Sequence, residues 1–183
     1  MDLREVTEFL KDCLGYIITI GILIFVFVFI IAINPVAGNS MSPTLEDGDL
    51  TLVSKFSYYF KMIERNQIVV IKKNNKSYVK RVVGLPGEEI HYLDGILYVN
   101  GKAYKETFLK DGVKTSSFMF EDICDINDCP DGRIPKGMYL VLGDNRPESK
   151  DSRDSEIGLI KKKEIKGQVF FRLFPFSNFG KVN

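Results

Sequence analysis

Three short segments of this chain carry residue types that can hydrolyse a peptide bond without a histidine base. They are residues 38–49 (GNSMSPTLEDGD), 78–88 (YVKRVVGLPGE) and 143–153 (GDNRPESKDSR). The chain has 1 histidine, His91, so a Ser-His-Asp triad would depend on that residue alone. A catalytic metal site built mainly from histidine is excluded for the same reason. If the chain is a hydrolase, the sequence favours a base other than histidine.

Lys80, in the second segment, can be that base, and Ser40, in the first, can be the nucleophile. A lysine amine accepts a proton only when it is neutral, so its pKa must fall from about 10.4 to about 7–8, at a free-energy cost of about 4 kcal/mol. Strand alternation places Lys80 and Arg81 on opposite faces. The neighbours of Lys80 are apolar and would desolvate its amine: Tyr78, Val79, Val82 and Val83. Taken singly, each of the three segments is also compatible with an ordinary turn.

Together and in this order, the three segments resemble the motifs of bacterial type I signal peptidases (leader peptidases). The motifs are residues 40–45 (SMSPTL), 80–87 (KRVVGLPG), and 143–146 (GDNR) followed by 149–153 (SKDSR). An apolar run precedes them, as in the compact enzymes of Gram-positive bacteria that this chain resembles. The resemblance extends to about residue 160 and omits the segment between the second and third motifs.

The resemblance implies that Ser40 is the nucleophile and Lys80 the general base. It further implies that Ser149 orients the lysine amine and that Gly143 leaves room for the lysine side chain. Two supporting ion pairs are expected: Arg81 with Asp144, and Asp151 with Arg153.

The resemblance also bears on how the oxyanion of the reaction would be stabilised. The backbone N–H of Ser40 is one implied donor. In some members of the family a serine hydroxyl two residues before the nucleophile is another, and here that position is Gly38. The second donor is therefore missing, or comes from water or another backbone group.

The implied substrates are secreted preproteins, cut after Ala-x-Ala-like sites and bound as an extended strand. Residues that flank the catalytic pair are candidates for shallow pockets that exclude bulky side chains: Val36, Gly38, Met41, Leu45, Tyr78 and Val79. No cofactor, metal ion or nucleic acid is expected.

Residues 14–33 form a 20-residue run without a charged side chain, long enough as a helix for a bilayer core of ~30 Å. A buried core helix and a cleavable signal peptide are the alternatives, although a signal peptide has a shorter apolar region. We predict an uncleaved transmembrane helix. Arg4 and Lys11 precede it and no basic residue follows until Lys55, which predicts a cytoplasmic N-terminus.

The predicted organisation is a cytoplasmic segment 1–13, a transmembrane helix 14–33 and an extracytoplasmic catalytic domain 34–183, in a single-pass protein of the cell membrane. Several aromatic side chains are candidates for contact with lipid, or for the core: Tyr58, Tyr59, Phe60, Phe174, Phe176 and Phe179.

Beyond residue 35, period-two alternation predicts a mainly β domain, with antiparallel sheets in a sandwich or partly closed barrel. The predicted strands are 49–54, 67–72, 77–83, 96–99, 138–142 and 168–173. Asp94-Gly95 and Asn100-Gly101 are signals for hairpin turns.

Residues 102–136 are a charged, turn-rich variable insert that contains Cys124 and Cys129. An exported domain can form a disulfide there. Two free thiols, or a metal loop formed with the nearby acidic residues, are the alternatives, and the spacing does not match an EF-hand.

The overall composition limits the remaining functions. Lys and Arg number 25 against 24 Asp and Glu, and 45% of the residues are apolar, which excludes a disordered tail and gives no basic excess for nucleic acid. A related Ser/Lys peptidase of narrow substrate range and a catalytically inactive, membrane-tethered β binding module are the alternatives to a signal peptidase. The joint presence of Ser40, Lys80 and Ser149 argues against the inactive module.

Overall fold

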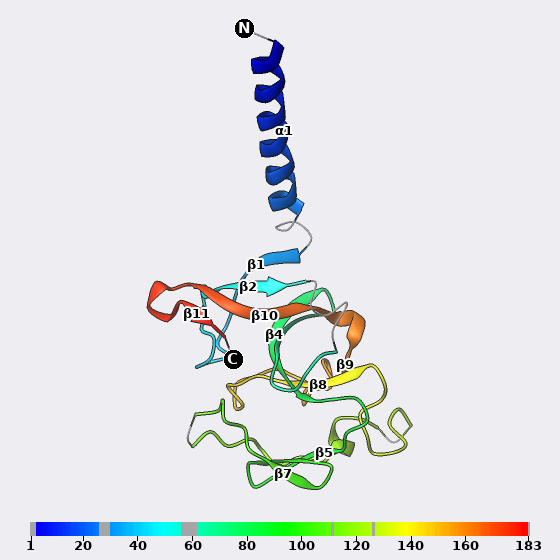
Figure 1. The fold of residues 1–183 in the computed structure, drawn as a ribbon. Coiled ribbons are helices and arrows are strands. Elements are labelled where there is room, and N and C mark those ends of the chain that lie inside the picture. The colour runs from blue at the N-terminus through cyan, green and yellow to red at the C-terminus, as the bar shows by residue number, and fades with distance from the viewer. Residues whose placement is uncertain (1–2, 26–29, 56–61, 111, 126, 183) are drawn as a thin grey trace.

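The computed structural model describes residues 3–25, 30–55, 62–110, 112–125 and 127–182 (Figure 1). One long helix, α1 (Leu3–Phe25), precedes a part made mainly of strands. The strands are β1 (Ile31–Pro35), β2 (Leu50–Ser54), β3 (Ile68–Lys73), β4 (Lys76–Gly84), β5 (Ile90–Leu93), β6 (Ile96–Val99), β7 (Lys102–Tyr104), β8 (Met138–Leu142), β9 (Ile160–Lys161), β10 (Ile165–Phe174) and β11 (Gly180–Lys181). Three short 3-10 helices complete the elements: η2 (Phe120–Asp122), η3 (Lys162–Glu164) and η4 (Phe176–Asn178).

The main sheet has 8 strands, in the order β1-β2-β10-β3-β4-β8-β9, with β11 paired to β10. All strand pairings of this sheet among the described residues are antiparallel, which confirms the predicted mainly β, antiparallel class. The path is open, because β1 and β9 at its two ends do not pair with each other among the described residues. The sheet joins segments far apart in the chain, since β10 lies between β2 and β3.

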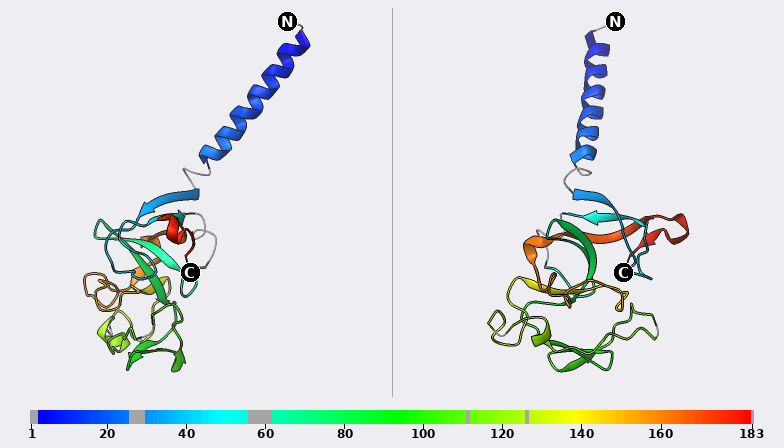
Figure 2. Two further views of the ribbon diagram at one scale, coloured as in Figure 1. Left: turned by 90° about the vertical axis from the view of Figure 1, so that its left-hand side faces the viewer. Right: turned by 180° about the vertical axis from the view of Figure 1, so that it is seen from behind.

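A smaller sheet of 3 strands, β5-β6-β7, lies at the end of the β part away from α1 (Figures 1 and 2). Its two hairpin turns fall at the predicted dipeptides. Asp94 and Gly95 have φ values of 52° and 83°, and Asn100 and Gly101 have 50° and 76°. Positive φ at both turn residues is the geometry that Asn-Gly and Asp-Gly favour.

Three clusters of buried apolar side chains hold these layers together. One lies between the small sheet and β8 and includes Tyr92 and Leu140. A second packs Val82 against Val141. The third packs Met41 and other residues around the first motif against β2, β3 and β10. The candidate catalytic segments therefore rest directly on the core.

The N-terminal region differs from the predicted helix at residues 14–33. The helix begins at Leu3, inside the predicted cytoplasmic segment, and ends at Phe25, whereas residues 31–33 belong to β1. Residues 26–29 lie outside the described part. A run of Ile, Val and Phe suits a strand as well as a helix, and pairing with β2, from Ile31↔Ser54 to Pro35↔Leu50, decides for the strand.

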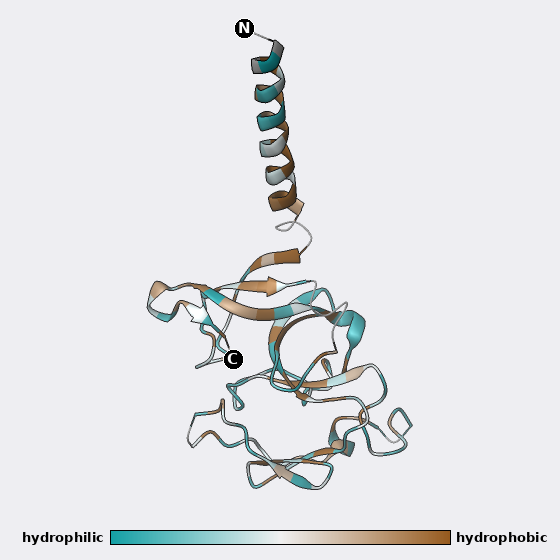
Figure 3. Cartoon of the chain, viewed as in Figure 1, coloured by the Kyte–Doolittle hydropathy of each residue, from teal (hydrophilic) through white to brown (hydrophobic). Residues whose placement is uncertain are grey.

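The helix changes character along its length, from polar first turns to apolar last turns (Figure 3). Within the described residues, no helix has both the length and the apolar character needed to cross a membrane.

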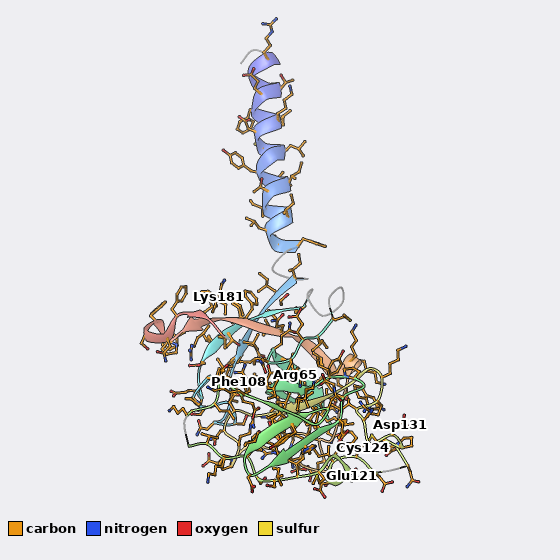
Figure 4. The ribbon with its side chains drawn as sticks, turned by 60° about the horizontal axis from the view of Figure 1, so that its bottom comes forward. Arg65, Phe108, Glu121, Cys124, Asp131 and Lys181 are labelled. Atoms are coloured by element: carbon orange, nitrogen blue, oxygen red, sulfur yellow. A yellow bond between two sulfur atoms is a disulfide. The ribbon has the colours of Figure 1, made fainter. Side chains whose placement is uncertain are left out.

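The variable insert contains β7, η2 and a disulfide between Cys124 and Cys129, which confirms the predicted bond. Cys124 lies near Glu121 and Asp131 at one end of the molecule (Figure 4). Because both cysteines form this bond, neither is a free thiol and neither can be a metal ligand. No group of His, Cys, Asp and Glu side chains suited to a metal occurs in the part of the chain that the structure describes.

Candidate active site

Ser40 lies in the loop between β1 and β2, which backbone hydrogen bonds close upon itself. The Val36 N–H donates to the Asp49 carbonyl at 2.8 Å, and the Leu45 N–H donates to the Met41 carbonyl at 3.0 Å. Met41, next to Ser40, is 1% exposed and packs into the core. The loop is therefore anchored on both sides of Ser40.

Lys80 projects from β4 toward this loop, and its Nζ lies 2.5 Å from Ser40 Oγ. The side chain is buried, at 2% exposed. Burial lowers the pKa of Lys80 to about 8, against the opposing fields of the Asp151 and Asp144 carboxylates, while Arg153 lowers it further. A serine hydroxyl thus contacts an amine that is partly neutral near neutral pH.

The third segment is fastened against the loop that carries Ser40. The Asn145 backbone N–H donates to the Ser40 carbonyl at 3.1 Å, and its side-chain amide donates to the Asn39 carbonyl at 3.1 Å. The segment returns to β8 through a hydrogen bond from the Ser152 N–H to the Val141 carbonyl, 3.0 Å long.

Gly143 makes this close approach possible because it has no side chain. A Cβ placed on Gly143 would lie 2.1 Å from Ser149 Oγ and 2.3 Å from the Ser40 carbonyl oxygen. Both distances are far inside van der Waals contact, so any other residue would force the two segments apart. In this structure the space that Gly143 leaves free is occupied by Ser149 and the Ser40 backbone.

Ser149, the residue predicted to orient the lysine amine, lies against Gly143. Its Oγ is buried and has no hydrogen-bond partner among the described residues. The described bond of the Lys80 amine runs to Ser40 Oγ, so the structure does not join Lys80 to Ser149. An unpaired buried hydroxyl is costly and calls for a functional explanation.

Arg81 and Asp144 form the expected ion pair, in a bidentate and fully buried form. The Nε and Nη2 atoms of Arg81 donate to the Asp144 carboxylate at 2.9 and 2.6 Å, and the two side chains are 1% and 0% exposed. The Thr44 hydroxyl donates to the same carboxylate at 2.6 Å. Asp144 therefore links all three segments: the first through Thr44, the second through Arg81, and its own.

Asp151 and Arg153 form the second expected pair. Arg153 Nε donates to Asp151 Oδ1 at 2.9 Å, and Asp151 Oδ2 accepts from the Gly143 N–H at 3.0 Å. The pair therefore holds the backbone of Gly143 from the side opposite Ser40.

Comparison with known proteins identifies the family of the chain. A family model described as signal peptidase, peptidase S26, matches residues 8–174. The chain belongs to this family. It is 42% identical over 181 residues to signal peptidase IB of Staphylococcus aureus, covering 92% of this chain and 93% of that protein. It is 43% identical over 159 residues to signal peptidase I of Bacillus caldolyticus, covering 82% and 84%.

A crystal structure of a signal peptidase I from Enterococcus faecalis is 33% identical, with a TM-score of 0.49, and the match covers 59% of this chain and 97% of that one. Membership of the signal peptidase family makes this chain a hydrolase of the serine endopeptidase class.

The residues predicted to bind substrate fall into two groups in this signal peptidase fold. Val36, Met41 and Leu45 are 4%, 1% and 0% exposed and belong to the core, so they do not line an open pocket. Tyr78 and Val79 are half-buried on β4 beside Lys80. The spacing of residues around Ser40 could not show that Val36, Met41 and Leu45 face the core, because a tight loop does not follow strand alternation.

Gly38 is exposed, with φ of 82°, and its N–H donates to Asp47 Oδ1 at 2.7 Å. Asp47 thus engages the backbone donor at the position where some relatives place a serine hydroxyl. Gly38 is not a free second donor for an oxyanion in this arrangement.

The edge of β4 beside Ser40 and Lys80 is open on one side. β3 pairs with β4 from Lys76 to Arg81, whereas β8 pairs with it only from Arg81 to Gly84. Among the described residues, the stretch that carries Tyr78, Val79 and Lys80 has a strand partner on one side only. An extended peptide can pair with such an edge.

Thr44, Asn145 and Arg146 are site residues to which sequence reasoning assigned no role. All three lie inside the motifs, so their positions were a signal, but nothing in the sequence tells which partner each contacts. Glu106, described below, lies in the variable insert and carries no motif at all.

Proposed function

We propose that this chain is a membrane-anchored serine endopeptidase that removes signal peptides from secreted preproteins after Ala-x-Ala-like sites, with Ser40 as nucleophile and Lys80 as general base. The observation that carries the proposal is the 2.5 Å approach of a buried amine, with its pKa lowered to about 8, to the Ser40 hydroxyl. Relatives named signal peptidase I and IB, matched over most of the chain, support the choice of substrate.

Acylation begins with Lys80 neutral. The amine accepts the Ser40 Oγ proton as the oxygen attacks the carbonyl carbon of the scissile bond. The resulting ammonium then donates that proton to the leaving nitrogen, the C–N bond breaks, and the signal peptide remains esterified to Ser40.

Deacylation repeats the exchange with water. Lys80, neutral again, accepts a proton from a water molecule that attacks the ester. The ester C–O bond breaks, and the proton returns to Ser40 Oγ. The second step needs the same amine in the same place, which requires a rigidly held lysine.

Ser149 is the residue we assign to holding the amine. Its buried, unpaired Oγ can accept a hydrogen bond from Lys80 once the Ser40 hydroxyl is engaged with substrate. For the oxyanion, the Ser40 backbone N–H is the proposed donor.

The substrate segment binds as an added strand on the open edge of β4. Tyr78 and Val79 then lie beside the scissile residue of the substrate. Gly38 precedes Ser40 by two residues in the sequence. Backbone pairing requires no particular side chain, which explains a broad range of preprotein substrates. A narrow space beside Ser40 excludes bulky side chains and selects small residues near the scissile bond.

The apolar residues from position 14 to the start of β1 hold the chain in the membrane, with the N-terminus in the cytoplasm and the β part outside. Their support is the charge-free sequence and the exposed apolar side chains of α1, such as Ile17 and Ile20, 66% and 56% exposed. Phe174, Phe176 and Phe179, 48%, 79% and 57% exposed, offer a second lipid contact. The hairpin between β10 and β11, which carries them, lies in the same half of the β part as β1 (Figures 1 and 2). Tyr58, Tyr59 and Phe60 lie outside the described residues.

The deciding experiment is cleavage of a purified preprotein with an Ala-x-Ala site, followed by sequencing of the new N-terminus. The full chain should cut after the second alanine. Ser40→Ala, Lys80→Ala and Lys80→Arg should each lose about 10³-fold or more of the activity. Arginine should not replace Lys80 as a base, because it cannot become neutral.

Lys76→Ala is the matched control, since Lys76 is an exposed lysine on the same strand. It should cut at the normal rate. Normal processing by Lys80→Ala would refute the proposed mechanism, and absence of cleavage by the unaltered chain would favour the inactive binding module.

A further inference from the structure

A buried polar cluster outside the catalytic pair surrounds Arg146, which is 1% exposed. Its guanidinium Nη1 donates to the Tyr92 hydroxyl at 2.9 Å and to Thr115 Oγ1 at 2.5 Å. Its Nη2 donates to Glu106 Oε1 at 2.6 Å. Tyr92 belongs to the small sheet, and Glu106 and Thr115 belong to the variable insert.

The cluster is internally complete. The Tyr92 hydroxyl donates in turn to Glu106 Oε1 at 2.7 Å, and the side chains of Arg146 and Glu106 are 0% and 5% exposed. A guanidinium buried to this degree depends on its carboxylate, because an unpaired charge in the interior is strongly destabilising. Glu106 is the only carboxylate with which Arg146 forms an ion pair in the described part of the chain.

Phe108, two residues after Glu106, covers a second buried arginine. The Arg81 guanidinium carbon lies 4.0 Å from the centre of the Phe108 ring, and that of Arg146 lies 6.0 Å from it. Phe108 is labelled in Figure 4. One short segment of the insert thus contacts the arginine beside Lys80 in the chain and the arginine of the third motif.

Arg146 connects this cluster to the nucleophile. Its Nε donates to the Gly143 carbonyl at 3.1 Å, and its own carbonyl accepts from Arg153 at 2.7 Å. Gly143 lies against the Ser40 carbonyl. Asn145, which precedes Arg146 in the sequence, donates its N–H to the same carbonyl. Displacement of Arg146 would shift the backbone on which Ser40 rests.

We infer that Glu106 is a positioning residue for the peptidase, and that the insert and the small sheet serve as a buttress for the catalytic turn at residues 143–146. This inference rests on the proposed function, because it concerns the rate of the Ser40 reaction. Glu106 touches neither Ser40 nor Lys80 in any described hydrogen bond, so it acts through Arg146 and Gly143.

The test is Glu106→Gln in the full chain, assayed on a preprotein and on a small activated ester that acylates Ser40. Glutamine keeps the size of the side chain and removes its charge. We expect kcat to fall about tenfold with KM changed by less than about twofold, and acylation by the ester to fall in parallel. A residue that served only global stability would change the melting temperature and leave kcat of the folded fraction intact.

The matched control is Glu164→Gln, which breaks another partly buried ion pair, with Lys73 at 3.3 Å, on the main sheet. It should leave kcat unchanged. Tyr92→Phe is the milder companion variant, since it keeps the buried ring and removes one hydroxyl that contacts both Arg146 and Glu106. It tests the inference should Glu106→Gln fail to fold, and we expect its kcat to fall about threefold.

The outcomes distinguish failure of the proposed function from failure of the buttress. An unaltered chain that cleaves neither the preprotein nor the ester would overturn the proposed function. An active unaltered chain, together with wild-type kcat in folded Glu106→Gln or in Tyr92→Phe, would overturn only the buttress.

Discussion

At the scale of the single residue, Lys80 is a cation whose surroundings favour its neutral form. Burial lowers its pKa from 10.5 to about 8, although Asp151 and Asp144 act in the opposite direction. The effect of desolvation on the pKa of Lys80 therefore outweighs the opposing effect of the two carboxylates. The shift corresponds to a differential free energy of about 3 kcal/mol between the two protonation states. The two carboxylates offset the fall in pKa only in part, because each is paired with an arginine.

The pH dependence of cleavage follows from this pKa. The base is active when neutral, so kcat/KM should rise with pH through an apparent pKa of about 8 and fall about tenfold per unit in more acid solution. The measurement is a profile of kcat/KM on a peptide substrate from about pH 5 to about pH 10. Lys76→Ala should reproduce the profile, and constant activity down to about pH 5 would argue against a lysine base.

Gly143→Ala should damage the site through the clash of its Cβ with Ser149 Oγ and the Ser40 carbonyl, at 2.1 and 2.3 Å. We expect a loss of about 1–3 kcal/mol in the free energy of unfolding and a fall in kcat of about a hundredfold. The control is Gly167→Ala, whose Cβ would meet Val53 Cγ1 at 2.6 Å in the main sheet. Comparable destabilisation with normal kcat in the control, measured by denaturant unfolding and by turnover, would assign the rate loss to the site. Equal rate losses in both variants would contradict this account.

At the scale of the element, the Asp144 carboxylate is the junction of the three catalytic segments. Arg81 on β4 and Thr44 in the loop after β1 both donate to it. The junction is stronger than its exposed counterparts, because its ion pair is bidentate and buried. Loosening of any one segment should therefore be felt by the other two.

Thr44→Val tests this junction. The variant keeps the shape of the side chain and removes the hydroxyl that donates to Asp144 at 2.6 Å. We expect the free energy of unfolding to fall by about 1–2 kcal/mol and kcat/KM to fall about tenfold. Thr51→Val removes a similar bond, to the Asn34 carbonyl at 2.9 Å, and should cost stability without loss of rate. The prediction fails if the two variants have the same kcat/KM.

The sequence predicted the strands of the domain better than it predicted the N-terminal region. The predicted strands 49–54, 77–83 and 138–142 match β2, β4 and β8 to within a residue or two, because alternation, glycine and asparagine mark their ends. In the apolar run, neither periodicity nor a turn residue separates α1 from β1. Only pairing with β2, which is a tertiary interaction, fixes that boundary.

In the site, too, the sequence predicted the residues that lie in motifs and missed a residue that only the tertiary fold brings into place. Ser40, Lys80 and the ion pairs of Arg81 and Arg153 were within reach of motif reasoning, since each lies at a fixed spacing in a motif. Glu106 was not, because a glutamate in a charged stretch looks like any solvated side chain until the fold brings it to Arg146, 40 residues away.

At the scale of the whole molecule, α1 projects away from the β part in all views (Figures 1 and 2). The side chains along its later turns are exposed, with Ile17, Ile22 and Ile24 at 66%, 59% and 58%. β1, by contrast, is paired with β2 along its whole length. The boundary between the projecting helix and the β domain therefore lies between α1 and β1.

Two truncations should locate this boundary. Removal of residues 1–30 keeps β1 and should change the free energy of unfolding by less than about 1 kcal/mol, with normal kcat/KM on a short peptide. Removal of residues 1–35 deletes β1, exposes the edge of β2 and should destabilise the domain and reduce that kcat/KM. The measurements are thermal unfolding and peptide cleavage, and equal behaviour of the two truncations would contradict the boundary.

The position of β10 has a consequence for how the main sheet is assembled. Ser40 belongs to the half of the main sheet formed by β1 and β2, and Lys80 to the half formed by β3, β4 and β8. β10 lies between β2 and β3 and is the only strand that joins these halves in the described sheet. Residues 165–174 follow both halves in the chain, so the two halves become one continuous sheet only when this late strand is in place. A chain that lacked residues 165–174 would leave β2 and β3 without the strand that lies between them.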